Sequence, residues 1–172
     1  MQPVRYSDGP TVEVEVRVDA PAERVWALVT DIELPARFSE EFQGATWLEA
    51  DGPSVGARFV GRNRHAALGE WETTSFVVRF EPLRWFEWAV TDANEPSASW
   101  WFALEPAGDG TVVLRQGTRL GPGRSGLNLA IDAMPEKEER IIARRLQEHE
   151  RNMQATVEGV KRLAEATAPV EP

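Results

Sequence analysis

A run of strand-like segments between residues 43 and 120 constrains the fold more than any other feature of the chain. The predicted strands cover residues 43–50, 57–65, 70–80, 85–92, 97–105 and 111–120. Turn signals such as Asp51-Gly52-Pro53 and Gly108-Asp109-Gly110 separate them. Because consecutive strands joined by short turns usually pair with each other, this run predicts an antiparallel sheet.

Helical segments lie before and after this run. Valines that alternate with charged residues predict a half-buried strand at residues 11–18. Pro21 suits the first turn of a short helix, and a second short helix follows to about residue 41. The chain turns helical again at about residue 127, and its last helix is predicted from residue 135 or 136 to about residue 166. Helices that are separate from the strands in sequence favour an α+β fold, in which the long helix buries its apolar stripe on the concave side of a curled sheet.

The length of the chain predicts one domain that occupies residues 1–172, with a core of about residues 11–165 and flexible ends. The last six residues, 167–172, are expected to fray. The sequence contains no cysteine, which excludes disulfides, thiol chemistry and cysteine metal sites.

Charge and hydropathy limit the partners of the protein. A net charge of −9 disfavours nucleic acid, because that kind of binding depends on neutralising phosphates. No apolar run approaches the ~18 residues that span a membrane, and the N-terminus lacks the layout of a signal peptide. We therefore expect a cytoplasmic protein without stable membrane insertion, either a monomer or a homodimer.

Four stretches of the sequence carry a family resemblance. They are DAPAERVWALVTDIE after the first strand, GATWLEADGPSVGARF, WETTSFVVRFEPLRWFEW, and a Gly-Asp-Gly-Thr hairpin that leads into VVLRQ. Together they resemble the START-related (SRPBCC) superfamily, in its polyketide cyclase/dehydrase-like branch, over about residues 11–165. This resemblance implies the helix-grip fold, a seven-stranded antiparallel sheet wrapped around a long C-terminal helix with a cavity between them.

The alternation within the strands predicts which side chains face the long helix. The predicted cross-strand pairs include Asn63–Glu72, Val78–Trp88, Trp88–Phe102 and Phe102–Leu114. These pairs place one apolar set on the inner face, namely Phe59, Phe76, Val78, Phe80, Phe86, Trp88, Val90, Trp100, Phe102, Leu104, Val112 and Leu114. A slip of one residue would move any of these side chains to the other face.

The predicted inner face has a polar end near one rim of the sheet. Its members are Asn63, His65, Glu72, Thr74, Asp92, Gln116 and Thr118. The opposite face is largely charged but also receives Trp71, Trp85 and Trp101. Three explanations stay open for these tryptophans: they cover each other, they pair with a partner chain, or the predicted register fails locally.

The last helix has its own apolar stripe at spacings of three and four residues. The stripe consists of Ile142, Leu146, His149, Met153, Val157, Val160 and Ala164. Both histidines of the chain, His65 and His149, are therefore predicted to point inward.

These faces define a candidate ligand site. The predicted ligand-binding residues are Phe59, Asn63, Thr74, Phe76, Trp88, Val90, Trp100, Phe102, Gln116, Leu146 and Met153. The candidates for proton transfer are His149, Glu72 and His65. Each candidate also has a structural interpretation, since His149 could be a satisfied core histidine, His65 a cap of the hairpin rim, and Glu72 a partner of Asn63.

Three functions stay open at this stage. The first is a carrier that binds a lipid, polyketide or isoprenoid in the cavity. The second, implied by the resemblance, is a polyketide aromatase/cyclase-like enzyme that folds a poly-β-ketone and moves protons. The third is a protein-interaction role that uses the outward tryptophans. No nucleophile, phosphate-loop or dinucleotide motif occurs, and we expect neither a metal nor a cofactor.

Overall fold

The computed structural model describes residues 2–49 and 52–166. Residues 167–172, which are predicted to fray, lie outside the described residues. So does Asp51, the first residue of the first turn signal.

The described residues form seven strands and three α-helices, joined by short turns. The strands are β1 (Thr11–Val18), β2 (Phe42–Trp47), β3 (Arg58–His65), β4 (Gly69–Glu81), β5 (Trp85–Val90), β6 (Ala98–Pro106) and β7 (Val112–Leu120). The helices are α1 (Ala22–Val29), α2 (Gly126–Ala133) and α3 (Glu138–Glu165), with 3-10 turns η1 (Tyr6–Asp8), η2 (Leu34–Arg37) and η3 (Pro135–Lys137).

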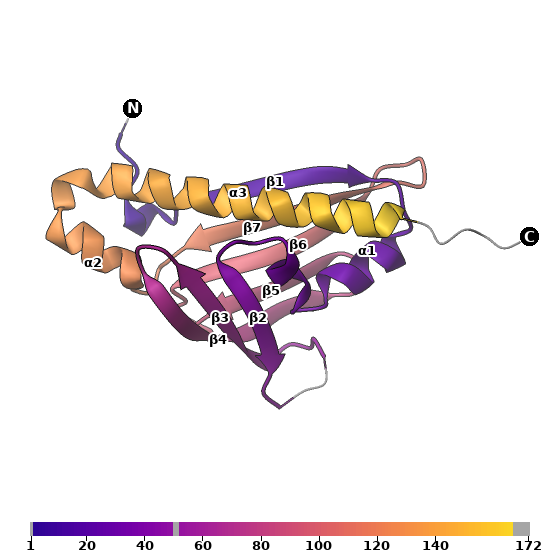
Figure 1. The fold of residues 1–172 in the computed structure, drawn as a ribbon, viewed down its shortest axis with the longest axis horizontal. Coiled ribbons are helices and arrows are strands. Elements are labelled where there is room, and N and C mark those ends of the chain that lie inside the picture. The colour runs from indigo at the N-terminus through magenta and orange to yellow at the C-terminus, as the bar shows by residue number, and fades with distance from the viewer. Residues whose placement is uncertain (1, 50–51, 167–172) are drawn as a thin grey trace, which may run out of the picture.

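The strands form one antiparallel sheet in the order β1-β7-β6-β5-β4-β3-β2. The long helix α3 lies across this sheet, and it packs against β1, β7 and α1 (Figure 1). The short helix α2 leads into α3 at one end of the molecule, and α1 lies near the other end of α3 (Figure 1). This arrangement confirms the predicted α+β class and the helix-grip fold.

The stripe of α3 is buried almost as predicted, from Ile142 to Ala164. Leu146 is the exception, because it is only half-buried and belongs to a second apolar cluster with Tyr6 and Ile131. That cluster joins α3 to α2 and η1 at the end of the sheet. Leu146 therefore contributes to the packing of α2 and does not face the interior of the sheet.

The predicted register between β3 and β4 is wrong by one residue. Asn63 lies opposite Trp71, and Glu72 lies opposite Arg62 on the outer face. The cause is the turn, because His65 pairs with Gly69, a glycine with φ +77°, and only three residues form the loop between them. Three-residue hairpin loops commonly close through such a left-handed residue. A one-residue shift inverts the faces, so Thr74 and Phe76 also point outward on β4.

A β-bulge in β4 returns the following residues to the predicted faces. The register shifts between Val77 and Arg79, so that Val77 lies opposite Trp88 in place of the predicted Val78. Val77 is buried, whereas Val78 is 37% exposed. Since a bulge bends its strand and increases the local twist, the bulge at Val78 contributes to the curl of the sheet.

The predicted pairings of β5 with β6 and of β6 with β7 are each displaced by two residues. Trp88 lies opposite Trp100 in place of Phe102, and Phe102 lies opposite Gln116 in place of Leu114. Because side chains alternate with a period of two, a displacement of two residues keeps every residue on its predicted face. The inner faces of these three strands are therefore confirmed.

The outward tryptophans have two different explanations. Trp85 and Trp101 cover each other on the outer face, with ring centroids 6.1 Å apart and planes 11° from parallel. The guanidinium of Arg79 lies 4.3 Å from the Trp85 ring, and Gly117 leaves room for the Trp101 ring. Trp71 instead faces the interior, as a consequence of the corrected β3–β4 register.

Gly159 on α3 packs directly against the ring of Phe38 in the segment before β2. A Cβ atom on this residue would lie 2.4 Å from Cε1 of Phe38. Gly159→Ala is therefore expected to lower the free energy of unfolding by about 1 kcal/mol, because overpacking costs about 1–3 kcal/mol and the gain in helix propensity offsets about 1 kcal/mol. Urea unfolding measures this change.

A second background separates the two effects. In a Phe38→Ala protein the ring is absent, so the same Gly159→Ala change should raise the free energy of unfolding through helix propensity alone. If Gly159→Ala stabilised the otherwise unchanged protein, the close packing of Phe38 on α3 would be wrong.

Candidate functional site

A cavity of about 630 Å³ lies between the inner face of the sheet and α3. Strands β3 to β7 supply one wall, α3 supplies the opposite wall, and α2 borders one end. The apolar side chains that line it include Ile32, Phe42, Phe59, Trp71, Trp88, Val90, Trp100, Leu120, Leu127 and Met153. Apolar walls with a few polar groups are the usual composition of a small-molecule site.

The cavity opens between the β3–β4 hairpin and α2. Leu68 in the hairpin loop and Leu129 on α2 both line the cavity, yet they are 53% and 72% exposed. Ser125 begins α2 by accepting a hydrogen bond from the backbone N–H of Leu127. The cap thus orients the helix that carries one side of the opening.

Most of the predicted ligand-binding residues line this cavity. They are Phe59, Asn63, Trp88, Val90, Trp100, Gln116 and Met153. Phe102 faces inward but is only 1% exposed and packs against Trp88, in the core next to the cavity. Thr74 and Phe76 lie on the outer face for the reason given above, and Leu146 packs in the cluster beside α2.

Two polar side chains sit deep in the cavity wall. Gln116 on β7 is 5% exposed. Its Oε1 is buried and has no hydrogen-bond partner among the described residues. His149 on α3 is 6% exposed, and its ring meets Trp100 edge to face with centroids 4.9 Å apart. Burial, followed by the charges of Arg145 and His65, lowers the pKa of His149 from 6.5 to about 3. The imidazole is therefore neutral at neutral pH.

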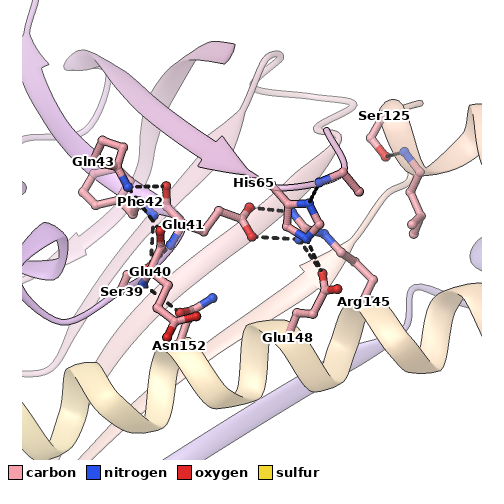
Figure 2. Close-up of polar contacts among 12 residues, drawn as sticks. Ser39, Glu40, Glu41, Phe42, Gln43, His65, Ser125, Arg145, Glu148 and Asn152 are labelled. Carbon is pink, nitrogen blue, oxygen red and sulfur yellow. Dashed lines mark hydrogen bonds and ion pairs between the residues drawn. The ribbon is translucent and has the colours of Figure 1, made fainter. Parts of the chain in front are cut away.

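A second groove lies on the outside of the molecule, between the β3–β4 hairpin and α3. Four charged or titratable side chains form a cluster between this groove and the cavity (Figure 2), namely Glu41, His65, Arg145 and Glu148. Arg145 on α3 donates to both carboxylate oxygens of Glu41, at 2.5 and 2.8 Å. It also donates to Glu148 at 2.9 Å, and Glu148 Oε2 lies 3.2 Å from Nε2 of His65. We call these residues the Arg145 cluster. The cluster ties the start of β2 and the end of β3 to α3.

Pairing favours the charged forms of Arg145 and Glu148 within the Arg145 cluster. Burial by itself would lower the pKa of Arg145, but hydrogen bonds and charge from Glu41 and Glu148 outweigh it and raise that pKa. Burial would likewise raise the pKa of Glu148, but Arg145 and then His65 outweigh it and lower that pKa. With side-chain exposures of 13% for Arg145 and 12% for Glu41, removing one partner would leave a charge largely shielded from water.

Glu41, His65 and Glu148 each place one potential metal-ligand atom within 4.8 Å of the others. Both carboxylates already pair with Arg145, so its guanidinium supplies the positive charge beside them.

The structure does not bring the three candidates for proton transfer together. His149 lies inside the cavity. His65 faces α3, but it lies outside the cavity in the Arg145 cluster. Glu72 lies on the outer face opposite Arg62.

Several residues of the site were missed in the sequence. Trp71 and Ser75 were placed on the wrong face by the β3–β4 register. Arg145 could have been noticed, because it precedes His149 by four residues and Glu148 by three, and both spacings place side chains next to each other on a helix. Glu41 carries no local signal, since it meets Arg145 only through the tertiary fold.

None of the helices in the described part of the chain is both long enough and apolar enough to cross a membrane.

Comparison with known proteins finds a family model and solved structures that are similar to this chain. The family model described as polyketide cyclase / dehydrase and lipid transport matches residues 9–165. A solution structure of a polyketide-cyclase-like protein from Corynebacterium glutamicum is 32% identical, with 95% of this chain and 94% of that chain covered and a TM-score of 0.65. A comparison with curated proteins finds no match.

Two further structures share the fold at lower identity. A di-domain aromatase/cyclase, BexL, from the BE-7585A biosynthetic pathway is 20% identical with a TM-score of 0.66, and the match covers 92% of this chain and 51% of that chain. A START superfamily protein from Mycobacterium smegmatis is 15% identical with a TM-score of 0.56, over 87% of this chain and 98% of that one.

Proposed function

The chain belongs to the polyketide cyclase / dehydrase and lipid-transport family, and from that premise we propose that it binds a hydrophobic small molecule in the cavity between the sheet and α3. The observation that carries this proposal is the cavity of about 630 Å³ with its largely apolar lining. That volume falls in the usual range for sites that enclose small molecules, about 300–1,000 Å³.

The cavity wall supplies the affinity. Each 100 Å² of apolar ligand surface that leaves water contributes about 2.5 kcal/mol, before the loss of freedom on binding is subtracted. The exposed leucines Leu68 and Leu129 extend the apolar surface to the opening, so an apolar ligand keeps favourable contacts as it enters. A carrier that takes up a lipid, polyketide or isoprenoid and releases it elsewhere needs these two features.

The alternative, a polyketide cyclase-like enzyme in the same cavity, has less support. Its candidate groups His65, Glu72 and His149 do not share one site. General-base catalysis is most efficient when the pKa of the base lies near the working pH, and the pKa of His149 is lowered to about 3.

A protein-interaction role also has less support. Trp85 and Trp101 stack on each other, and their indole N–H groups donate to Glu87 and Glu13 at 2.7 and 2.8 Å. Trp71 faces the cavity. The tryptophans thus have partners within this chain.

The direct test is native mass spectrometry of the protein as purified, with solvent extraction of what it carries. We expect an apolar molecule bound in a ratio of one to one. Titration with phenylnaphthylamine, a neutral apolar dye that fluoresces in apolar surroundings, tests the cavity independently of the natural ligand.

Filling the cavity should abolish this binding. Ala98 lines the cavity on β6, and Ala98→Phe places a ring in the space that the ligand would use. Because the ring displaces ligand without removing core atoms, we expect the affinity for the dye to fall at least about tenfold and the fold to be retained. Fluorescence titration measures the affinity, and circular dichroism checks the fold.

The matched control is Val78→Phe, which adds a ring to the exposed bulge of β4 on the other face. This variant should bind the dye like the unchanged protein. Equal loss of binding in both variants, or no loss in Ala98→Phe, would contradict the cavity as the site.

A further inference from the structure

The Gln116 amide has an unfilled hydrogen-bonding requirement inside the cavity wall. The side chain is 5% exposed, and among the described residues no group donates to its Oε1. Leaving a buried acceptor without a partner is unfavourable, so a molecule that occupies the cavity gains by satisfying it. Gln116 lines the cavity, which brings its side chain within reach of a ligand.

The neighbouring polar side chains do not meet this requirement. The hydroxyl of Thr118, two residues along β7, donates to the backbone oxygen of Ser99 at 3.0 Å. The hydroxyl of Thr156 on α3 donates to the backbone oxygen of Asn152 at 2.9 Å. Phe102, the cross-strand neighbour of Gln116, offers only an apolar ring.

The charges around the cavity are already paired. Two arginines line it, Arg145 and Arg124. Arg145 is bonded to Glu41 and Glu148, and Arg124 forms an ion pair with Asp132. A ligand carboxylate or phosphate in the interior would have to displace one of these carboxylates or remain unpaired, and an unpaired buried charge is strongly unfavourable.

We propose that the ligand is an uncharged lipophile whose buried end carries a hydroxyl group, and that this hydroxyl hydrogen-bonds to the amide of Gln116. This inference rests on the proposed binding function and specifies the class of ligand. A hydroxyl suits the amide because it donates to the carbonyl oxygen and accepts from the NH₂ group. The neutral ring of His149 adds a further uncharged polar group to the same wall.

Three pyrenes with a hydroxyl, a methyl or a carboxylate at the same ring position test this class. Equilibrium dialysis gives the dissociation constant of each for the full chain and for Gln116→Leu. The ratio of the hydroxypyrene constant to the methylpyrene constant should rise about fivefold to tenfold in Gln116→Leu, the effect of one hydrogen bond. The comparison between the two proteins cancels the difference in hydration of the two compounds. In the unchanged protein, pyrene carboxylate should bind more weakly than hydroxypyrene.

The matched control is Gln147→Leu, the same change at an exposed position of α3, which should leave the ratio unchanged. Gln116→Leu should keep or raise the thermal stability, because it removes a buried polar group without a partner. An unchanged ratio in Gln116→Leu, or tightest binding of the carboxylate, would overturn this inference while the cavity still binds pyrenes. Failure of the unchanged protein to bind any pyrene or phenylnaphthylamine would instead overturn the proposed function.

Discussion

Replacing Arg145 with alanine is expected to lower the free energy of unfolding by about 3 kcal/mol. The guanidinium is 13% exposed and bonds to Glu41 and Glu148, which are 12% and 20% exposed. Without it, two carboxylates lie close together and largely shielded from water, with His65 as the neighbour that remains. The pKa of Glu148 should then rise, because burial already acts in that direction and the charge that opposes it is gone. Urea unfolding at neutral pH measures the change.

Arg144→Ala is the matched control for this prediction. Arg144 is the preceding residue of α3, and it also faces Glu148, at 3.6 Å, but its side chain is 80% exposed. Its removal should change stability by no more than about 0.5 kcal/mol. If Arg145→Ala behaved like Arg144→Ala, the Arg145 cluster would have no role in joining the strands to α3.

A further variant separates the loss of attraction from the exposure of unpaired charge. Removing all three charges together, with Arg145→Met, Glu41→Gln and Glu148→Gln, should recover most of the stability lost in Arg145→Ala. Such a recovery would show that stability requires the charges of the cluster to compensate one another, and that it does not require charged side chains at these positions.

The second large effect is a dependence of stability on pH that comes from His149. In the folded chain its pKa is lowered from 6.5 to about 3, mainly by burial, so the ring stays neutral while the same histidine in the unfolded chain takes up a proton. Between these values the unfolded state therefore binds more protons, and stability falls as the pH falls. The slope approaches about 1.4 kcal/mol per pH unit below pH 6.5, so stability should fall by roughly 2 kcal/mol between pH 6.5 and 4.5.

His149→Gln should remove this slope, because the amide keeps a polar group at the site and does not titrate. Urea unfolding at several pH values between about 4.5 and 7 is compared between the two proteins, so that the contribution of Glu148, whose pKa is lowered from 4.5, cancels. His65→Gln is the control, since it removes the other histidine and should leave the slope in place. A slope that survives unchanged in His149→Gln would show that other groups cause it, and it would contradict the lowered pKa of His149.

Much of the fold could be predicted from the sequence because strand alternation and turn residues are local signals. The errors arose where a single backbone position decided the outcome. Gly69 closes the β3–β4 hairpin after three residues instead of four, and this one difference moved Trp71 inward and Glu72 outward. The two-residue displacements at β6 did not change any face, so the cavity wall from Trp88, Trp100 and Gln116 was still found.

The Arg145 cluster could not be predicted in the same way. Glu41 and Arg145 are separated by 104 residues, and each looks like an ordinary surface charge in the sequence. Only the path of α3 across the sheet brings them together, and pattern arguments within single elements do not contain that information. The same holds for α2, whose leucines border the opening although the sequence indicates only that the segment is helical.

The placement of the tryptophans has an optical consequence. Trp71, Trp88 and Trp100 border the cavity, whereas Trp85 and Trp101 form a stacked pair on the opposite side of the sheet. A guest whose absorption overlaps indole emission therefore accepts excitation from indoles that border it, while the stacked pair on the other face of the sheet gives an exciton signal that depends on the packing of β5 against β6. The chain thus carries separate intrinsic spectroscopic reporters for occupancy and for the integrity of its β-layer.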